Sequence, residues 1–308
     1  MEEISRDFWV RYGYVWQSHQ CTLCRPLVDV PGEAVRIQAC TVDGLTSVRS
    51  RSCSVWKCPR QLVNLTRDRY CTPHDHLAQR CVLCVEPALP GRNTCSLPHH
   101  RAAKKRWDEY RKSRAKFHIS QKRAAAAGRI QEIPRARDLR RLFGRSYSGG
   151  HFIATYSCGV VANRTVLYGI EGSEDVAGAL DEFWPDPMTR PQVMFYDLAC
   201  RRAAYLKNHP DPGWDSTCLY VDRFHFQTHK TRSCRIENNP SDTRNPILWD
   251  SSREGRDPVF RFNSSASECT NAWAEGLGKV ISGMHSVYNE FVFDMAAVTH
   301  NEILRVAN

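Results

Sequence analysis

The sequence lacks any apolar stretch approaching the roughly 20 residues that a membrane-spanning helix needs. Its first segment, MEEISRDFWVRYG, starts acidic and has no apolar core of the kind found in secretory signals. We therefore expect neither a membrane protein nor a secreted one, but a protein of a reducing compartment inside the cell. Disulfides are rare in such compartments, so the fourteen cysteines of the chain favour metal binding.

Cysteine is present in quantity, and its distribution is uneven. Nine cysteines precede residue 100, and five are scattered through the rest of the chain. An isolated free cysteine commonly serves as a small buried apolar residue, which suits the scattered five. It does not account for nine cysteines in a segment with little continuous hydrophobic pattern. We expect that segment to consist of small loops and hairpins held by metal ions.

Closely spaced cysteines and histidines between residues 53 and 100 predict two zinc sites. Zinc takes four sulfur or nitrogen ligands at the corners of a tetrahedron, and tight turns provide such ligands in pairs. Pairing in chain order gives a first site of Cys53, Cys58, Cys71 and His74 and a second site of Cys81, Cys84, Cys95 and His100. His99 competes with His100 for the last position, and the spacing allows interleaved pairing equally well.

A weaker third set consists of Cys21, Cys24 and Cys40, with His19 as a candidate fourth ligand. Burial of these thiols among nearby Trp, Val and Leu side chains explains the set equally well. Where protein ligands fill all four positions, the zinc is structural, because no place remains for water or substrate. We expect this part of the chain to lose its fold when the metal is removed.

Basic charge is concentrated in one segment. The formal net charge is +10, but residues 101–145 contain 16 Lys and Arg against four acids, so this segment carries +12 and the remainder about −2. Its many good helix formers predict a long basic helix or a pair of helices. Contact with DNA phosphates and a merely solvated linker explain such a block equally well. The candidate phosphate-binding residues are Lys104, Lys105, Arg106, Arg111, Lys112, Arg114, Lys116, Lys122 and Arg123.

The remainder of the chain alternates between strand-like and helix-like segments. Strands are predicted at 151–157, 160–169, 191–197 and 218–226, helices at 173–184, 201–208 and from 266 to the end, and an irregular insertion at 235–265. This order predicts an α/β fold, a mixed sheet with helices on its faces. The predicted parts are a zinc-binding domain at 1–100, a basic helical linker at 101–147 and an α/β domain at 148–308.

Three acids occupy positions from which they could hold divalent cations. Nucleases that transfer phosphoryl groups bind two divalent ions through carboxylates from separate segments, and oxygen ligands suit Mg²⁺. Asp197 ends one apolar strand and Asp222 ends another, so each would project beyond the edge of a sheet. Glu268 lies on a helix whose Trp273 and Leu277 face a core. By position alone, an ordinary surface acid or helix cap is the simpler explanation of each.

A second polar cluster follows Asp222. His225 and His229 are four residues apart and would share one face of a helix. Together with Cys234 they could bind a further metal ion or hold the segment by hydrogen bonds. The hydrogen-bonding role is favoured, because only three ligands are seen.

These residues resemble a known family. CSVWKC, RYCTPH, CVLC and GRNTCSLPHHRA are similar to the cysteine-cluster domains found with Kyakuja-Dileera-Zisupton (KDZ) transposases of fungi. LYGIEGSEDV, FYDLAC, DRFHFQTHKTRSC and SSASECTNAWAE resemble the transposase core of those proteins. The resemblance covers most of the chain outside the basic segment. It implies an RNase H-like fold, descent from a cut-and-paste DNA transposase and a nuclear location.

Under this resemblance, Asp197 matches the second catalytic acid and Glu268 matches the late glutamate. The first acid is expected on the first strand, within or near residues 151–157, where the sequence has neither Asp nor Glu. Glu171 and Asp175 are the nearest acids. A missing ligand would leave a pair of Mg²⁺ ions under-coordinated and the phosphoryl charge poorly offset. Either the nuclease core is degenerate, or its catalytic set differs from this one.

Three functions follow from these observations. The preferred one is a transposase-derived protein that binds structural Zn²⁺ and DNA, with weak or no nuclease activity. The alternatives are an active DNA transposase that uses Mg²⁺ and a zinc-built scaffold for protein interactions. We expect no small-molecule substrate and no membrane partner, and the sequence leaves oligomerisation open.

Overall fold

The computed structural model describes residues 8–30, 33–112, 143–144, 146–169, 171–252 and 256–307. The chain divides into two compact units, one of residues 1–50 with 148–308 and the other of residues 51–147. This division has a boundary after residue 50, where none was predicted, and none at residue 100, whereas its boundary after residue 147 coincides with a predicted one. The first fifty residues belong with the C-terminal half because they contribute the central strand of its sheet.

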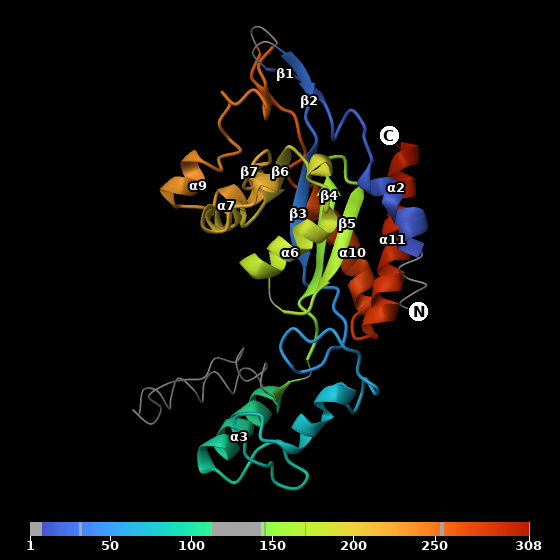
Figure 1. Cartoon of the computed structure of the whole chain (residues 1–308), viewed down its shortest axis with the longest axis vertical. Helices are drawn as coiled ribbons and strands as arrows, with labels where there is room; N and C mark the ends of the chain where they lie inside the picture. Colours follow the sequence, from blue (N-terminus) through green and yellow to red (C-terminus); the bar gives the residue numbers. More distant parts are fainter. Residues whose placement is uncertain are drawn as a thin grey trace. The chain divides into compact units, whose positions relative to one another are not determined.

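A five-stranded mixed sheet forms the centre of the larger unit (Figure 1). Its strands lie in the order β5-β4-β3-β6-β7 and are Val161–Leu167, Gly150–Tyr156, Ala39–Leu45, Val193–Tyr196 and Cys218–Tyr220, respectively. β3 and β5 both run antiparallel to β4, whereas β6 runs parallel to β3 and β7 runs parallel to β6. Four of these strands fall in segments predicted as strands, and β3 falls in the segment predicted as zinc-binding loops.

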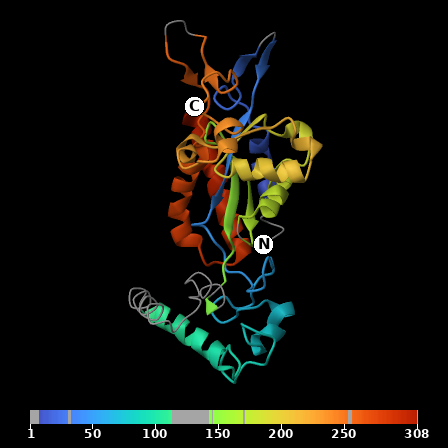
Figure 2. The same ribbon diagram turned by 90° about the vertical axis from the view of Figure 1, so that its left-hand side faces the viewer.

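Helices cover both faces of the sheet (Figures 1 and 2). On one face, α6 (Ser173–Phe183) and α7 (Ala199–Asn208) contribute buried side chains to the largest apolar core. On the other face, α10 (Ala266–Ile281) and α11 (Ser286–Ala307) enclose a second core. The predicted α/β class with a mixed sheet is confirmed.

The central strand β3 alternates between these two cores. Cys40 and Val42 point into the core beneath α6, whereas Leu45 packs against α10 and α11. Burial raises the pKa of the Cys40 thiol, so Cys40 is a neutral core residue. The prediction of Cys40 as a zinc ligand is therefore corrected, and its neighbour in the sequence, Thr41, faces α10.

Shorter elements complete the larger unit. They are η1 (Trp9–Gly13), α2 (Tyr14–Gln17), β1 (Leu27–Val30), β2 (Glu33–Arg36), η3 (Pro187–Thr189), η4 (Pro212–Trp214), α8 (Arg223–Phe226), α9 (Arg232–Ile236), β8 (Trp249–Asp250) and β9 (Val259–Phe260). The β8–β9 pair lies in the segment predicted as irregular. None of the helices in the described parts of the chain has both the length and the apolar character needed to cross a membrane.

The described residues of the smaller unit, 51–112, 143–144 and 146–147, include two helices and two small apolar clusters. Its helices are η2 (Thr72–Gln79) and α3 (Pro98–Lys112). One cluster surrounds Leu62 and the other surrounds Trp107 of α3 with Phe143. α3 is the described part of the predicted basic helix. Residues 113–142 lie outside the described residues, and with them the predicted phosphate-binding residues Arg114, Lys116, Lys122 and Arg123.

Candidate functional site

The smaller unit brings together the four side chains predicted for its first metal site. Nδ1 of His74 lies 3.5 Å from Sγ of Cys53, 3.6 Å from Sγ of Cys58 and 3.3 Å from Sγ of Cys71. The sulfurs of Cys58 and Cys71 are 3.8 Å apart. All three cysteines are buried, and His74 enters the group from the first turn of η2.

The second predicted site in this unit has the same construction. Nδ1 of His100, in the first turn of α3, lies 3.5 Å from Sγ of Cys81, 3.6 Å from Sγ of Cys84 and 3.2 Å from Sγ of Cys95. The sulfurs of Cys84 and Cys95 are 3.7 Å apart. The structure therefore pairs the ligands in chain order and places His100, not His99, in the group.

These distances fit zinc. A tetrahedron with Zn–S bonds of about 2.3 Å and Zn–N bonds of about 2.0–2.1 Å separates its sulfurs by about 3.8 Å and sulfur from nitrogen by about 3.5 Å. The two groups reproduce both separations, and three thiolates with one imidazole form a donor set that suits Zn²⁺. With four protein ligands at each site, the metal would be structural and closed to substrate.

A third group of four lies in the larger unit and consists of His19, Cys21, Cys24 and Cys158. Sγ of Cys21 lies 3.6 Å from Sγ of Cys24. Hydrogen bonding to Cys158 lowers the pKa of Cys24 to about 4 in spite of burial, which favours the thiolate that binds metal. Cys158 takes the place predicted for Cys40. It reaches the group from the β4–β5 turn, where Gly159 adopts a φ of 95°.

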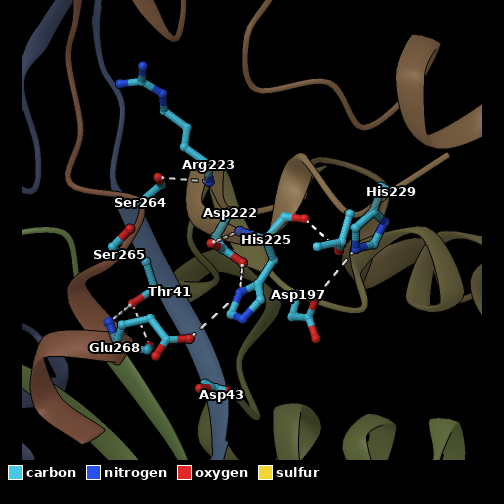
Figure 3. A network of polar contacts seen from close by, with 12 residues as sticks. Thr41, Asp43, Asp197, Asp222, Arg223, His225, His229, Ser264, Ser265 and Glu268 are labelled. Carbon is cyan, nitrogen blue, oxygen red and sulfur yellow. Dashed lines mark hydrogen bonds and ion pairs between the residues drawn. The ribbon is translucent and has the colours of Figure 1, made fainter. Parts of the chain in front are cut away.

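Three aspartates meet at the carboxyl-terminal edge of the parallel strands. Asp43 lies near the end of β3, Asp197 directly follows β6, and Asp222 follows β7 by two residues. The register pairs residue 42 with residue 196 and residue 195 with residue 220, which brings positions 43, 197 and 222 side by side. All three line one small pocket together with His225 and Glu268 (Figure 3).

Glu268 reaches this pocket from the first turn of α10. Two hydrogen bonds fix α10 against β3: the Ser267 amide donates to Oγ1 of Thr41 over 2.9 Å, and the two side-chain hydroxyl oxygens are 2.6 Å apart. One turn further, Nδ2 of Asn271 donates to Oδ2 of Asp43 over 2.6 Å. The interface between α10 and β3 therefore sets the positions of both Glu268 and Asp43.

Glu171 is a further carboxylate at this site. Its Oε1 accepts a hydrogen bond of 2.6 Å from the Tyr196 hydroxyl. A Cβ added at Gly44 would lie 2.6 Å from Oε2 of Glu171, so a larger residue after Asp43 would displace the Glu171 carboxylate. In the sequence, Glu171 is one of the acids nearest to the strand on which the first ligand was expected.

The clustered carboxylates repel one another. Burial raises the pKa of Asp43 to about 7, and the charges of Glu171 and Glu268 add to the increase. Burial also raises the pKa of Glu171, and the charge of Asp197 contributes. Such a concentration of negative charge is relieved by a bound cation, and perturbed carboxylates in a pocket are typical of functional sites.

The two histidines of the DRFHFQTH segment contact different carboxylates. Nδ1 of His225 lies 2.7 Å from Oδ2 of Asp222 and 3.6 Å from Oε1 of Glu268. Partial burial lowers the pKa of His225, but Asp222 and the other carboxylates outweigh it and the pKa is raised. His229 turns instead toward Asp197, with Nε2 at 3.3 Å from Oδ1 (Figure 3).

Two residues of these sites were missed by the sequence analysis. Asp43 was missed because the first strand was placed at 151–157, whereas the sheet begins at β3 and the smaller unit separates β3 from β4. The available signal was the run IQACTVDGL, an alternating segment that carries an acid near its end. Cys158 was missed because it lies far from Cys21 and Cys24 in the sequence.

Fold and site together define the class of protein, which is a mixed α/β domain with a carboxylate-lined pocket and a cysteine-cluster unit inserted after its central strand. Residues 41–106 match the family described as a CxC6-like cysteine cluster associated with KDZ transposases. This match takes in Asp43 and the two groups of cysteines and histidine in the smaller unit, and it supports a KDZ-associated family. Comparison with curated proteins and with solved structures finds no match.

Proposed function

We propose that this protein is a transposase-like enzyme that cleaves DNA and uses divalent cations held by Asp43, Asp197 and Glu268. The observation that carries the proposal is the convergence of these three carboxylates from β3, β6 and α10 on one pocket. A degenerate nuclease core was expected because no acid was found on the first strand. The position of Asp43 on β3, beside Asp197, supports Asp43 as that acid and so weakens the reason for expecting degeneracy.

The fold is consistent with the chemistry. Three antiparallel strands continued by two parallel ones, in the order β5-β4-β3-β6-β7, support the RNase H-like fold that the resemblance implies. In such a sheet the carboxyl ends of neighbouring parallel strands place ligand residues at one edge. The match of residues 41–106 to a cluster associated with KDZ transposases supports DNA as the substrate and the nucleus as the location.

The donor atoms at the pocket fit Mg²⁺, which prefers carboxylate oxygens and keeps several waters. When bound there, Mg²⁺ would activate a water molecule and offset charge on the phosphodiester. The protein's own contribution is to orient its carboxylates. Asn271 and the Gly44 amide each bind one oxygen of Asp43, over 2.6 and 2.7 Å.

Asp222 acts as a positioning residue in this proposal, because both of its oxygens engage one neighbour. Oδ1 accepts from the His225 amide over 3.0 Å, which caps α8, and Oδ2 pairs with the His225 ring. The protonated form of His225 is thereby favoured beside Glu268. When protonated, His225 would place a positive charge next to Glu268, where it can stabilise the carboxylate before a cation binds.

The smaller unit would contribute DNA affinity. α3 presents Lys105, Arg111 and Lys112 to solvent, whereas Lys104 is paired with Asp108 at 2.5 Å. Phosphate contacts of such residues are salt-sensitive and largely independent of base sequence. Zinc in the two groups of this unit would hold α3 in place, since His100 lies in its first turn.

A plasmid-nicking assay tests the proposal. The full chain should nick supercoiled plasmid in Mg²⁺ or Mn²⁺, and Asp43→Asn, Asp197→Asn and Glu268→Gln should each reduce the rate by at least about 100-fold, since each removes a negative ligand of the cation that offsets the phosphoryl charge. Asp29→Asn, at an exposed acid on β1, is the matched control and should nick at the wild-type rate. Cleavage that survives Asp43→Asn would overturn the proposed set.

A further inference from the structure

A second cluster of metal-binding side chains lies directly beside the carboxylate pocket. Cys200 lies in the first turn of α7, His229 lies between α8 and α9, and Cys234 lies on α9. One ligand atom of each lies within 4.8 Å of the other two. Nδ1 of His229 is 3.8 Å from Sγ of Cys200. These residues are outside the segment that matches the cysteine-cluster family.

His229 connects this cluster to the proposed active site through its two ring nitrogens. Nδ1 faces the sulfurs, while Nε2 lies 3.3 Å from Oδ1 of Asp197. Metal-binding histidines almost always donate their second N–H to a carboxylate or carbonyl, which fixes the ring orientation. Here that carboxylate is one of the three proposed catalytic ligands, and it precedes Cys200 by only three residues.

The surroundings of Cys234 fit a metal ligand. Cys234 is 2% exposed, and its sulfur accepts a hydrogen bond of 2.8 Å from the Thr231 hydroxyl. A buried thiolate needs a compensating charge, which a divalent cation provides.

We propose that Cys200, His229 and Cys234 bind a zinc ion, and that zinc-bound His229 holds Asp197 in place for the cation at the neighbouring carboxylate pocket. Two thiolates and an imidazole select Zn²⁺, whereas the oxygen donors a few ångströms away select Mg²⁺. The three protein ligands leave one coordination position for a water molecule. The positioning role of His229 rests on the proposed function of Asp197. The zinc site itself does not depend on that function.

The zinc content of the purified full chain tests the site. Relative to wild type, Cys234→Ser and Cys200→Ser should each lose about one zinc equivalent per chain. Cys269→Ser, the same substitution at an exposed cysteine on α10, is the control and should lose none. Circular dichroism and thermal unfolding report whether the variants fold. If a cysteine variant unfolds, His229→Asn serves in its place. Unchanged zinc content in a folded variant would overturn the zinc site.

The affinity of the carboxylate pocket for Mn²⁺ tests the positioning role. Loss of a residue behind a metal ligand typically weakens metal binding 10- to 100-fold, so we expect folded Cys234→Ser to bind Mn²⁺ about 10-fold more weakly than wild type. Cys269→Ser should bind it equally well. A lost zinc with unchanged Mn²⁺ affinity would overturn the positioning role. If wild type bound no Mn²⁺ and nicked no DNA, the proposed function would fail, while the zinc measurement would still decide the Cys₂His site.

Discussion

At the scale of single residues, the buried histidine on β4 gives the clearest pH dependence. Burial and the nearby charge of Arg164 lower the pKa of His151 from 6.5 to about 3, although its Nε2 lies 2.8 Å from Oδ1 of Asn289. The neutral ring is favoured in the folded protein, so the unfolded chain binds the extra proton below pH 6.5. Stability due to His151 is therefore complete above pH 6.5 and is lost as the pH falls toward 3.

We predict that the free energy of unfolding falls more steeply in wild type than in His151→Gln between pH 6.5 and 5. The difference in slope should approach 1.4 kcal/mol per pH unit, the maximum for one proton. Urea denaturation at several pH values measures this difference in slope. Comparing the two proteins cancels the contributions of the ionisable groups that they share. Parallel pH profiles would contradict this account of His151.

Residue identities in the two cysteine and histidine groups of the smaller unit could be predicted because their ligands are close in sequence. Short spacings such as that of Cys81 and Cys84 leave few ways to close a tetrahedron. Asp43 and Cys158 could not be placed in the same way. Each joins its site only through the pairing of strands that are distant in sequence. The spacing of residues along the chain does not indicate which distant strands pair.

At the scale of elements, one buried ion pair joins α11 to β5. Nε and Nη2 of Arg164 bind the two oxygens of Asp294 over 2.6 and 2.5 Å, and Nη1 lies 3.0 Å from Oε2 of Glu290. The side chains of Arg164 and Asp294 are 9% and 1% exposed, so neither can be rehydrated in the folded protein. The two charges also raise the pKa of Arg164 against the effect of burial.

We predict that Arg164→Met destabilises the protein by about 3–5 kcal/mol, because it removes the positive charge that Arg164 supplies to the buried Asp294 carboxylate. The double variant Arg164→Met with Asp294→Leu should recover much of that loss, since it removes both charges. Urea denaturation measures both effects. Arg305→Met, which breaks an exposed pair with Glu302, is the control and should change stability by less than about 1 kcal/mol. If Arg164→Met lowered the free energy of unfolding by as little as the control, the buried ion pair would not contribute to stability as proposed.

Most elements of the larger unit were predictable, because their hydrophobic patterns are local. The strands β4, β5 and β6 and the helices α6 and α7 lie where the sequence predicted them. β3 was not predicted, because its seven residues lie among cysteines that indicate zinc loops. Its strand character depends on neighbours β4 and β6, and both come more than 100 residues later in the chain.

At the scale of the whole molecule, the two units should respond differently to loss of metal. Among the described residues of the smaller unit the apolar clusters are small, whereas the larger unit has extensive cores on both faces of its sheet. A unit with little core depends on its metal for folding. The insertion of the smaller unit after β3 means that its unfolding need not remove any strand of the sheet.

We predict that a zinc chelator makes residues 51–112 rapidly cleavable by protease, while most of residues 148–307 stay resistant. Limited proteolysis followed by mass spectrometry measures this, and restoring Zn²⁺ should restore protection. The same protein with the chelator already saturated with zinc is the control. An identical digestion pattern with and without metal would contradict the structural role of zinc in the smaller unit.

Asp43, Asp197 and Glu268 line one pocket, at which we propose that divalent cations bind. Crystals of the full chain soaked in Mn²⁺, measured at a wavelength where manganese scatters anomalously, test this most directly. We predict an anomalous peak within coordination distance of all three carboxylates in wild type, and its loss in Asp43→Asn. An anomalous peak that persists in Asp43→Asn would contradict the account, and so would wild-type crystals with no peak at this pocket.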